Sequence, residues 1–375
     1  MILANLSIKY ISLQRSVVRS GIQITLFGMR IVIDEKIPYL CDALLSLGHR
    51  VAALPGVGIT KEALQGAEAL FVRTRTRCDA GLLEGTSVRF IGTATIGYDH
   101  IDADYCREKG IVWTNAAGCN AGAVLQYVQS VVYTCFEELS GLSMGIVGVG
   151  EIGSRVARWA SESGMKVLLN DPPREERGET GFSTLEEIAA ECDIITFHPT
   201  LERGGKYPSY HLADDAFLSS LRRCKLLINA SRGPVVDNKA LLSAIETGRL
   251  QHVALDVWEN EPQINLSLLN KVYIATPHIA GYSAEGKINA TGIVLEAFLR
   301  FINYKGDVPE LALSAPVNEV VEASSLREAL LGIYSPLGDT LALKSNPGDF
   351  EKLRNGYKLR REPSAYSIVI SPKKG

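Results

Sequence analysis

Three side chains in the second half of the chain have types that suit proton and hydride transfer, and each follows an apolar run that predicts a strand. They are an arginine, a glutamate and a histidine: Arg232, Glu261 and His278. Histidine can take up a proton near neutral pH, a carboxylate can fix its tautomer and stabilise the protonated ring, and arginine offers a planar fork for a carboxylate. Each alone also fits a structural role, but together they suit oxidation of the hydroxyl of a 2-hydroxy acid.

A glycine-rich segment in the middle of the chain predicts a site for the hydride acceptor. Residues 144–153 form an apolar run that ends in G-x-G-x-x-G, at Gly148, Gly150 and Gly153, and an amphipathic stretch follows at helical spacing. The first glycine permits a tight turn, the second lets backbone approach a pyrophosphate, and the third lets the helix pack closely on the strand. The helix N-terminus adds unpaired N–H groups and a partial positive charge, so we expect a bound dinucleotide.

The next predicted strand, over residues 166–170, is followed by Asp171. An acidic side chain at this place accepts hydrogen bonds from the adenosine ribose, which favours NAD over NADP. Arg174 lies close behind and has the charge to pair with a 2′-phosphate, so the preference is not absolute. The expected cofactor is NAD.

Strand-like and helix-like runs alternate from residue 30 onwards. The expected strands are 30–33, 50–54, 69–72, 90–92 and 112–114, then 145–147, 166–170, 194–197, 225–229, 253–256 and 272–275. Alternation of this kind predicts parallel sheets with crossover helices, including long helices over about 121–139 and 284–303. Because ligands bind at the carboxyl ends of parallel strands, Arg232, Glu261 and His278 should converge with the Gly148 loop on one crevice.

Composition excludes several classes of protein. The 375 residues are 46% apolar and 22% charged with net charge −3, and no long basic run suggests nucleic acid. No apolar run approaches the ~18 residues that span a bilayer. The cysteines are scattered and odd in number, with no C-x-x-C, which favours reduced thiols in the cytoplasm and argues against a zinc site. These seven residues are Cys41, Cys78, Cys106, Cys119, Cys135, Cys192 and Cys224.

The two ends of the chain differ from its middle. Residues 1–28 are basic and precede a second methionine, Met29, so we expect a non-essential leader or an upstream start codon. Residues 307–375 carry six prolines and a weak helix signal, with a basic amphipathic helix expected over 350–361 and a late strand over 366–370. We expect these last residues to form a small separate module.

Residues 229–233, 256–262 and 276–281 resemble the motifs of the D-isomer-specific 2-hydroxyacid dehydrogenases, and matching pieces lie at 72–74, 92–102 and 118–121. The resemblance runs from about residue 29 to residue 366. It implies that Arg232, Glu261 and His278 are the catalytic residues, and we expect no metal site. It also implies substrate contacts from Thr74, Thr95 and Tyr282. The implied NAD contacts, beyond the three glycines, are Asp171, Pro199, Ala230, Ser231, Arg232, Asp256 and Gly281.

Three positions depart from the family pattern, although none is in the catalytic set. Pro199 stands where a threonine is usual, so an NAD contact there must change or move to Thr200. Gln126 replaces a usual glutamate, and Ala117 replaces a usual proline.

The resemblance also implies an architecture. It is a Rossmann-type doubly wound NAD domain (117–278) inserted in a flavodoxin-like α/β substrate domain (29–116 and 279–305), followed by a C-terminal α+β dimerisation module (306–375). The implied partners are a phosphorylated 2-hydroxy acid and a second copy of the chain. Another D-2-hydroxy acid such as 3-phosphoglycerate, or an NAD-sensing regulatory protein of the same fold, remains an alternative.

A phosphate on the substrate requires cations. In an extended backbone Arg73, Arg75 and Arg77 would share one face, and we take Arg73 with Arg75 as the hypothesis for phosphate binding. Arg360 and Arg361, reaching across a dimer, are the competing suggestion.

Overall fold

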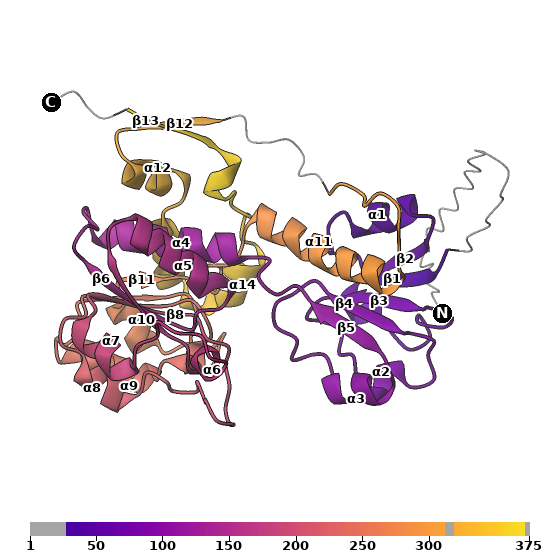
Figure 1. Cartoon of the computed structure of the whole chain (residues 1–375), viewed down its shortest axis with the longest axis horizontal. Helices are drawn as coiled ribbons and strands as arrows, with labels where there is room; N and C mark the ends of the chain where they lie inside the picture. The colour runs from indigo at the N-terminus through magenta and orange to yellow at the C-terminus, as the bar shows by residue number, and fades with distance from the viewer. Residues whose placement is uncertain (1–27, 312–318, 372–375) are drawn as a thin grey trace. The chain divides into compact units, whose positions relative to one another are not determined.

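The computed structural model describes residues 28–311 and 319–371 and divides them into two compact units (Figure 1). The first unit comprises the described residues up to Cys119 and those from Lys287 to the gap at 312, and the second comprises Asn120–Gly286 and the described residues after the gap. The expected leader lies outside the described residues except for Gly28. Across the described residues, no helix combines the length and the apolar character needed to cross a membrane.

The first unit is built on a five-stranded parallel sheet of order β2-β1-β3-β4-β5. Its strands are β1 (Arg30–Asp34), β2 (Arg50–Leu54), β3 (Ala69–Val72), β4 (Phe90–Thr93) and β5 (Val112–Asn115). The side chains of β1 alternate between two cores, Ile31 and Ile33 in one and Val32 in the other. Both faces are therefore buried, as parallel strands with crossover helices require.

Helices cover the two faces of this sheet. α1 (Leu40–Ser46) and α11 (Ala284–Phe301) contribute apolar side chains to the Ile31 face, whereas α2 (Ala80–Leu83) and α3 (Ala103–Glu108) contribute to the Val32 face.

The second unit contains a six-stranded parallel sheet of order β11-β10-β9-β8-β6-β7. Its strands are β6 (Ser143–Val147), β7 (Lys166–Asn170), β8 (Ile194–Phe197), β9 (Leu226–Asn229), β10 (His252–Leu255) and β11 (Ile274–Ala275). α4 (Ala121–Cys135) and α5 (Glu151–Glu162) pack on one face. The other face is covered by α7 (Leu185–Glu191), α8 (Asp215–Ser220), α9 (Asn238–Glu246) and α10 (Leu266–Lys271) (Figure 1). The predicted α/β class with a Rossmann-type sheet is confirmed.

The described part of the tail belongs to the second unit and does not form a separate compact body. β12 (Val320–Ala323) and β13 (Ser367–Ile370) form a small parallel pair. α12 (Leu326–Ile333) packs on α4, and α13 (Pro336–Ser345) packs on β11, where Ala275 N donates to Thr340 Oγ1 at 3.1 Å. The two compact units divide at 119/120 and 286/287. The expected domain boundaries at 116/117 and 278/279, with a third module, stay a prediction.

The helix expected over 350–361 is half as long as predicted. α14 (Phe350–Asn355) is followed by its C-cap Gly356, and Arg360 lies in an isolated bridge with Ser283. Because the helix signal of the tail is weak, α12 and α13 were not predicted. Each has a serine N-cap whose side chain accepts a backbone N–H, Ser325 and Ser335, and Pro336 occupies the first turn of α13.

Candidate active site

The expected catalytic residues follow three neighbouring parallel strands of the second unit. Arg232 follows β9, Glu261 lies in the segment after β10, and His278 follows β11. The glycine loop follows β6 in the same sheet. Because all six strands are parallel, these segments lie at one edge of the sheet, as the sequence predicted.

His278 and Glu261 form the contact expected of a base and the group that orients it. Nδ1 of His278 lies 2.8 Å from Oε2 of Glu261, and the two side chains are 27% and 18% exposed. The other carboxylate oxygen of Glu261 accepts the Trp258 N–H at 2.8 Å. The carboxylate is held from both sides, so it fixes Nδ1 as a donor and leaves Nε2 of His278 as the ring nitrogen that can accept a proton.

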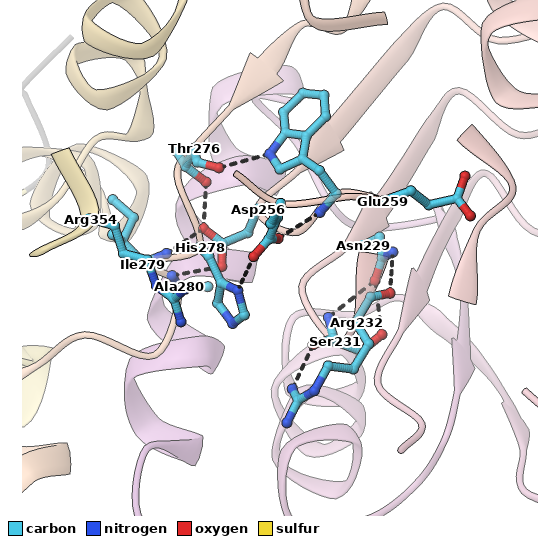
Figure 2. A network of polar contacts seen from close by, with 12 residues as sticks. Asn229, Ser231, Arg232, Asp256, Glu259, Thr276, His278, Ile279, Ala280 and Arg354 are labelled. Atoms are coloured by element: carbon cyan, nitrogen blue, oxygen red, sulfur yellow. Dashed lines mark hydrogen bonds and ion pairs between the residues drawn. The ribbon is translucent and has the colours of Figure 1, made fainter. Parts of the chain in front are cut away.

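Asp256 is committed to the backbone that follows His278. Its buried carboxylate accepts hydrogen bonds from Ile279 N at 2.8 Å and Ala280 N at 2.9 Å, and a third from Thr276 Oγ1 at 2.7 Å (Figure 2). In this structure Asp256 therefore orders the loop. Its expected contact with NAD stays a prediction.

Arg232 projects from a turn that Asn229 holds in place. Asn229 Oδ1 accepts both N–H and Oγ–H of Ser231, and Asn229 Nδ2 donates to Arg232 O at 3.0 Å. The Arg232 side chain donates to Ser231 O at 2.8 Å, its one acceptor among the described residues (Figure 2). The rest of the guanidinium is available for a carboxylate.

A glycine brings the Arg232 turn against the Glu261 segment. A Cβ on Gly233 would lie 1.9 Å from Trp258 O, closer than any side chain allows. Only glycine therefore lets the segments after β9 and β10 approach this closely.

The glycine loop has the geometry that a dinucleotide requires. Gly148 has φ 85°, and a Cβ there would lie 2.5 Å from Pro199 N. A Cβ on Gly153 would lie 2.1 Å from Gly148 O, so the helix α5 can pack on the loop only with glycine here. Gly150 is the N-cap of α5, and a Cβ there would meet open space. The room beside the helix N-terminus fits a pyrophosphate.

Asp171 and Arg174 close the loop from the next strand. Asp171 accepts the Val149 N–H at 2.8 Å and caps α6 (Pro172–Glu176) through Arg174 N at 3.1 Å. Arg174 Nε lies 2.9 Å from Glu179 Oε2 in an ion pair. The cation that the sequence suggested for a 2′-phosphate is therefore paired within the chain, which favours NAD.

A match to a protein family confirms what this geometry indicates. The model for the NAD binding domain of D-isomer specific 2-hydroxyacid dehydrogenases matches residues 122–280. An erythronate-4-phosphate dehydrogenase of Bacteroides fragilis is 51% identical over 348 residues, which cover 92% of this chain and 100% of that protein. The chain belongs to the D-isomer-specific 2-hydroxyacid dehydrogenase family. It is an NAD-dependent dehydrogenase, as predicted.

Other members extend the comparison. An enzyme of the same name from Cronobacter sakazakii is 43% identical and covers 91% of this chain and 94% of its own. The D-lactate dehydrogenase of Aquifex aeolicus, solved with NAD and lactic acid, has a TM-score of 0.55 at 25% identity and covers 73% of this chain and 95% of its own. The D-mandelate dehydrogenase of Rhodotorula graminis, with a TM-score of 0.63 at 22% identity, covers 74% and 95% and supports the shared fold.

The remaining expected contacts have local roles that the structure explains. A Cβ on Gly281 would lie 2.0 Å from Asn120 Nδ2, so this glycine lets the loop after His278 approach α4. Thr95 Oγ1 donates to Gly97 O at 2.9 Å. Tyr282 Oη accepts a 3.3 Å hydrogen bond from Arg354 Nε. Their roles toward NAD and substrate, like those of Ala230, Ser231 and Pro199, remain predictions.

The arginine-rich segment after β3 is not extended as the sequence suggested. Thr76 N donates to Arg73 O and Thr76 Oγ1 donates to Gly56 O at 2.8 Å, so the backbone turns. Arg77 is thereby separated from the others and pairs with Asp79 at 2.8 Å. Arg73 and Arg75 have no carboxylate partner among residues 28–311 and 319–371.

A cluster of cations in the first unit was not predicted. Burial lowers the pKa of Lys287, and the positive charges of Arg73 and Lys36 lower it further. Lys36 and Arg73 follow the adjacent parallel strands β1 and β3, and Lys287 lies one turn before Thr291, whose Oγ1 donates to Pro38 O at 3.0 Å. The cluster is assembled from three distant segments, so no local motif marks it.

One group of potential metal ligands lies among the described residues: His211, Asp237 and Glu259. His211 Nε2 is 2.7 Å from Glu259 Oε1, and Nδ1 is 3.5 Å from Asp237 Oδ2. In this structure each ring nitrogen of His211 faces a different carboxylate. The arrangement is that of an imidazole bridging two carboxylates.

Proposed function

We propose that this chain oxidises 4-phospho-D-erythronate at its 2-hydroxyl to (R)-3-hydroxy-2-oxo-4-phosphooxybutanoate, with reduction of NAD, in pyridoxal 5′-phosphate (vitamin B6) biosynthesis. The relatives named erythronate-4-phosphate dehydrogenase, 42–51% identical over more than nine-tenths of the chain, carry this proposal. His278, which Glu261 orients, is the base that such an oxidation needs.

In the proposed mechanism each catalytic residue has one task. The fork of Arg232 holds the substrate carboxylate and polarises the C2 oxygen. His278 takes the hydroxyl proton at Nε2, and Glu261 stabilises the imidazolium that results. Gly148, Gly150 and Gly153 would hold NAD, which would supply the acceptor for the hydride of C2.

We assign the substrate phosphate to the cations of the first unit. Within the described part of the chain Arg73 and Arg75 have no carboxylate partner, and the positive charges of Arg73 and Lys36 both act on Lys287. A phosphate dianion would relieve the repulsion within this cluster. The competing arginines of the tail are engaged within the chain, since Arg361 pairs with Glu285 and Arg360 is buried among backbone carbonyls.

Lys287→Gln tests this assignment. It should raise the KM of the phosphorylated substrate by roughly tenfold, about 1.4 kcal/mol, and leave the KM of NAD unchanged. Arg77→Gln is the matched control, because Arg77 is exposed and already paired with Asp79. Unchanged substrate KM values in both Lys287→Gln and Arg75→Ala would place the phosphate elsewhere.

We further propose a homodimer formed through the tail, in the cytoplasm. The small sheet β12–β13 and the start of α12 expose apolar side chains that a second copy would cover: Val320, Leu326, Val369 and Ile370. The seven cysteines form no disulfide among the described residues, which suits a reducing compartment. Light scattering of the full chain measures the mass, and a monomer at micromolar concentration would contradict the dimer.

The decisive experiment is turnover of 4-phospho-D-erythronate with NAD, followed by NADH absorbance, with D-3-phosphoglycerate as the control substrate. We expect kcat/KM to favour the first substrate by at least about 10²-fold, because a site that pairs with the phosphate at one chain length misplaces it at another. Preference for D-3-phosphoglycerate would assign the chain to a different reaction. Tight NADH binding without turnover of any 2-hydroxy acid would instead indicate the NAD-sensing alternative.

A further inference from the structure

The backbone directly after His278 is held from its N–H side by a carboxylate. His278 has φ 58°, a left-handed conformation that a non-glycine residue keeps only when its neighbours hold it. The N–H groups of Ile279 and Ala280 donate to the two oxygens of Asp256, at 2.8 and 2.9 Å (Figure 2). The carbonyls of the same two residues point elsewhere and, being buried, need donors of their own.

A single tail residue supplies those donors. Arg360 Nη1 donates to Ile279 O at 2.9 Å and Nη2 donates to Ala280 O. The remaining donations complete the guanidinium: Nη1 to Tyr282 O at 3.2 Å, Nη2 to Ala123 O at 3.0 Å and Nε to Gln126 Oε1 at 2.9 Å. Each of the five N–H groups that an arginine carries thus has an acceptor.

The surroundings of Arg360 hold it in this place. The side chain is only 8% exposed, and its guanidinium carbon lies 4.4 Å from the centre of the Tyr334 ring. Its backbone carbonyl accepts the Ala284 N–H at 3.0 Å, so both ends of the residue are fixed on the same loop. A lysine is a point charge with three donors and cannot reach five acceptors in a plane.

We propose that Arg360 is a positioning residue of the active site. It fixes the carbonyl side of residues 279–282, as Asp256 fixes the N–H side, and so sets where His278 stands relative to Glu261. The inference rests on the proposed role of His278 as the base. It makes the tail part of the catalytic apparatus of its own chain, in addition to any role in pairing.

The test compares Arg360→Ala and Arg360→Lys with Arg327→Ala. Arg327 is a matched control, because it is also a tail arginine that donates to a backbone carbonyl, Tyr133 O at 2.9 Å, but at the far end of α4. We expect both Arg360 variants to lose about 10²-fold in kcat with little change in the KM of NAD, since a displacement of ~1 Å at a catalytic group costs about that much. Millimolar guanidinium should restore part of the lost kcat of Arg360→Ala and none for Arg327→Ala.

A second measurement does not depend on turnover. Hydrogen–deuterium exchange at the amides of Ile279 and Ala280 should accelerate in both Arg360 variants and stay unchanged in Arg327→Ala. If Arg360→Ala does not fold, Arg360→Lys carries both measurements. Wild-type kcat in a folded Arg360 variant, or equal loss in Arg327→Ala, would overturn the inference. A His278→Ala enzyme with normal kcat would overturn the proposed base, while the exchange result would still decide the role of Arg360 in holding the loop.

Discussion

Glu261→Gln removes the negative charge of the residue that orients the proposed catalytic base. The amide has nearly the same shape, so it can still accept the Trp258 N–H that the carboxylate accepts at 2.8 Å. It removes the negative charge beside Nδ1 of His278, also 2.8 Å away, and turns an NH2 donor toward that nitrogen in place of an acceptor. The ground state of the enzyme should therefore fold normally, and the loss should appear when the imidazole takes the substrate proton.

The size of the loss follows from the geometry. Two unit charges about 4 Å apart attract by about 4 kcal/mol at the effective dielectric constant of ~20 that suits sites near a protein surface. The side chains are 27% and 18% exposed, so solvent screens part of this attraction, and we retain about half. A loss of about 2 kcal/mol in the transition state corresponds to roughly 30-fold in kcat/KM.

The assay is NADH absorbance at saturating NAD, with thermal unfolding to verify the fold. Glu259→Gln is the matched control, because this carboxylate lies in the same segment after β10 but faces His211 at 2.7 Å, away from His278 (Figure 2). It should leave kcat/KM within about twofold of wild type. If Glu261→Gln also stays within twofold, the negative charge has no part in stabilising the transition state and the assigned role is wrong.

Three further predictions concern the cofactor loop and its surroundings. Gly153→Ala should destabilise the fold by roughly 1–3 kcal/mol in urea unfolding and weaken NAD binding, because its Cβ would lie 2.1 Å from Gly148 O. Glu179→Gln frees Arg174 and should raise the ratio of kcat/KM for NADP to that for NAD by roughly threefold to tenfold; no change in the ratio would show that the ion pair does not set cofactor choice. Burial lowers the pKa of His198 from 6.5 to about 3, so between these pH values the unfolded chain binds a proton that the folded chain does not. As the pH is lowered below 6.5, the free energy of unfolding should therefore decrease by about 1.4 kcal/mol per pH unit more in wild type than in His198→Gln. Parallel curves of unfolding free energy against pH for the two proteins would contradict this.

Site residues whose placement depends on the sequence around them were predictable. The glycines of the cofactor loop are set by steric demands within one strand–turn–helix unit, and the structure meets each demand at Gly148 and Gly153. His278 and Glu261 were predicted because parallel strands bring their carboxyl ends together, and their 2.8 Å contact bears this out. Periodicity and strand order were enough for this part of the site.

Contacts that depend on distant segments were not predictable. Lys287 joins Arg73 only because α11 returns to the first sheet after residues 120–286 of the second unit, and nothing near either residue signals it. The turn at residues 74–76 was also not predicted, and the extended arginine face that we expected is absent there. Thr76 Oγ1 donates a hydrogen bond to Gly56 O, which lies 20 residues away in the chain. Alternation of residue types implies a shared face only where the backbone is a strand.

Gln126, which replaces a glutamate that is usual in the family, is explained by its contacts with the tail. Its side chain is 1% exposed and lies between two consecutive tail residues. Oε1 accepts the Arg360 Nε–H at 2.9 Å, and Nε2 donates to Arg361 O at 3.1 Å. A glutamate could accept the first bond but could not donate the second while ionised, which would leave a carboxylate oxygen facing a carbonyl oxygen in a buried place. The amide at this position therefore suits the contact with the tail, which packs on α4. Gln126 and the tail together support the loop that follows His278.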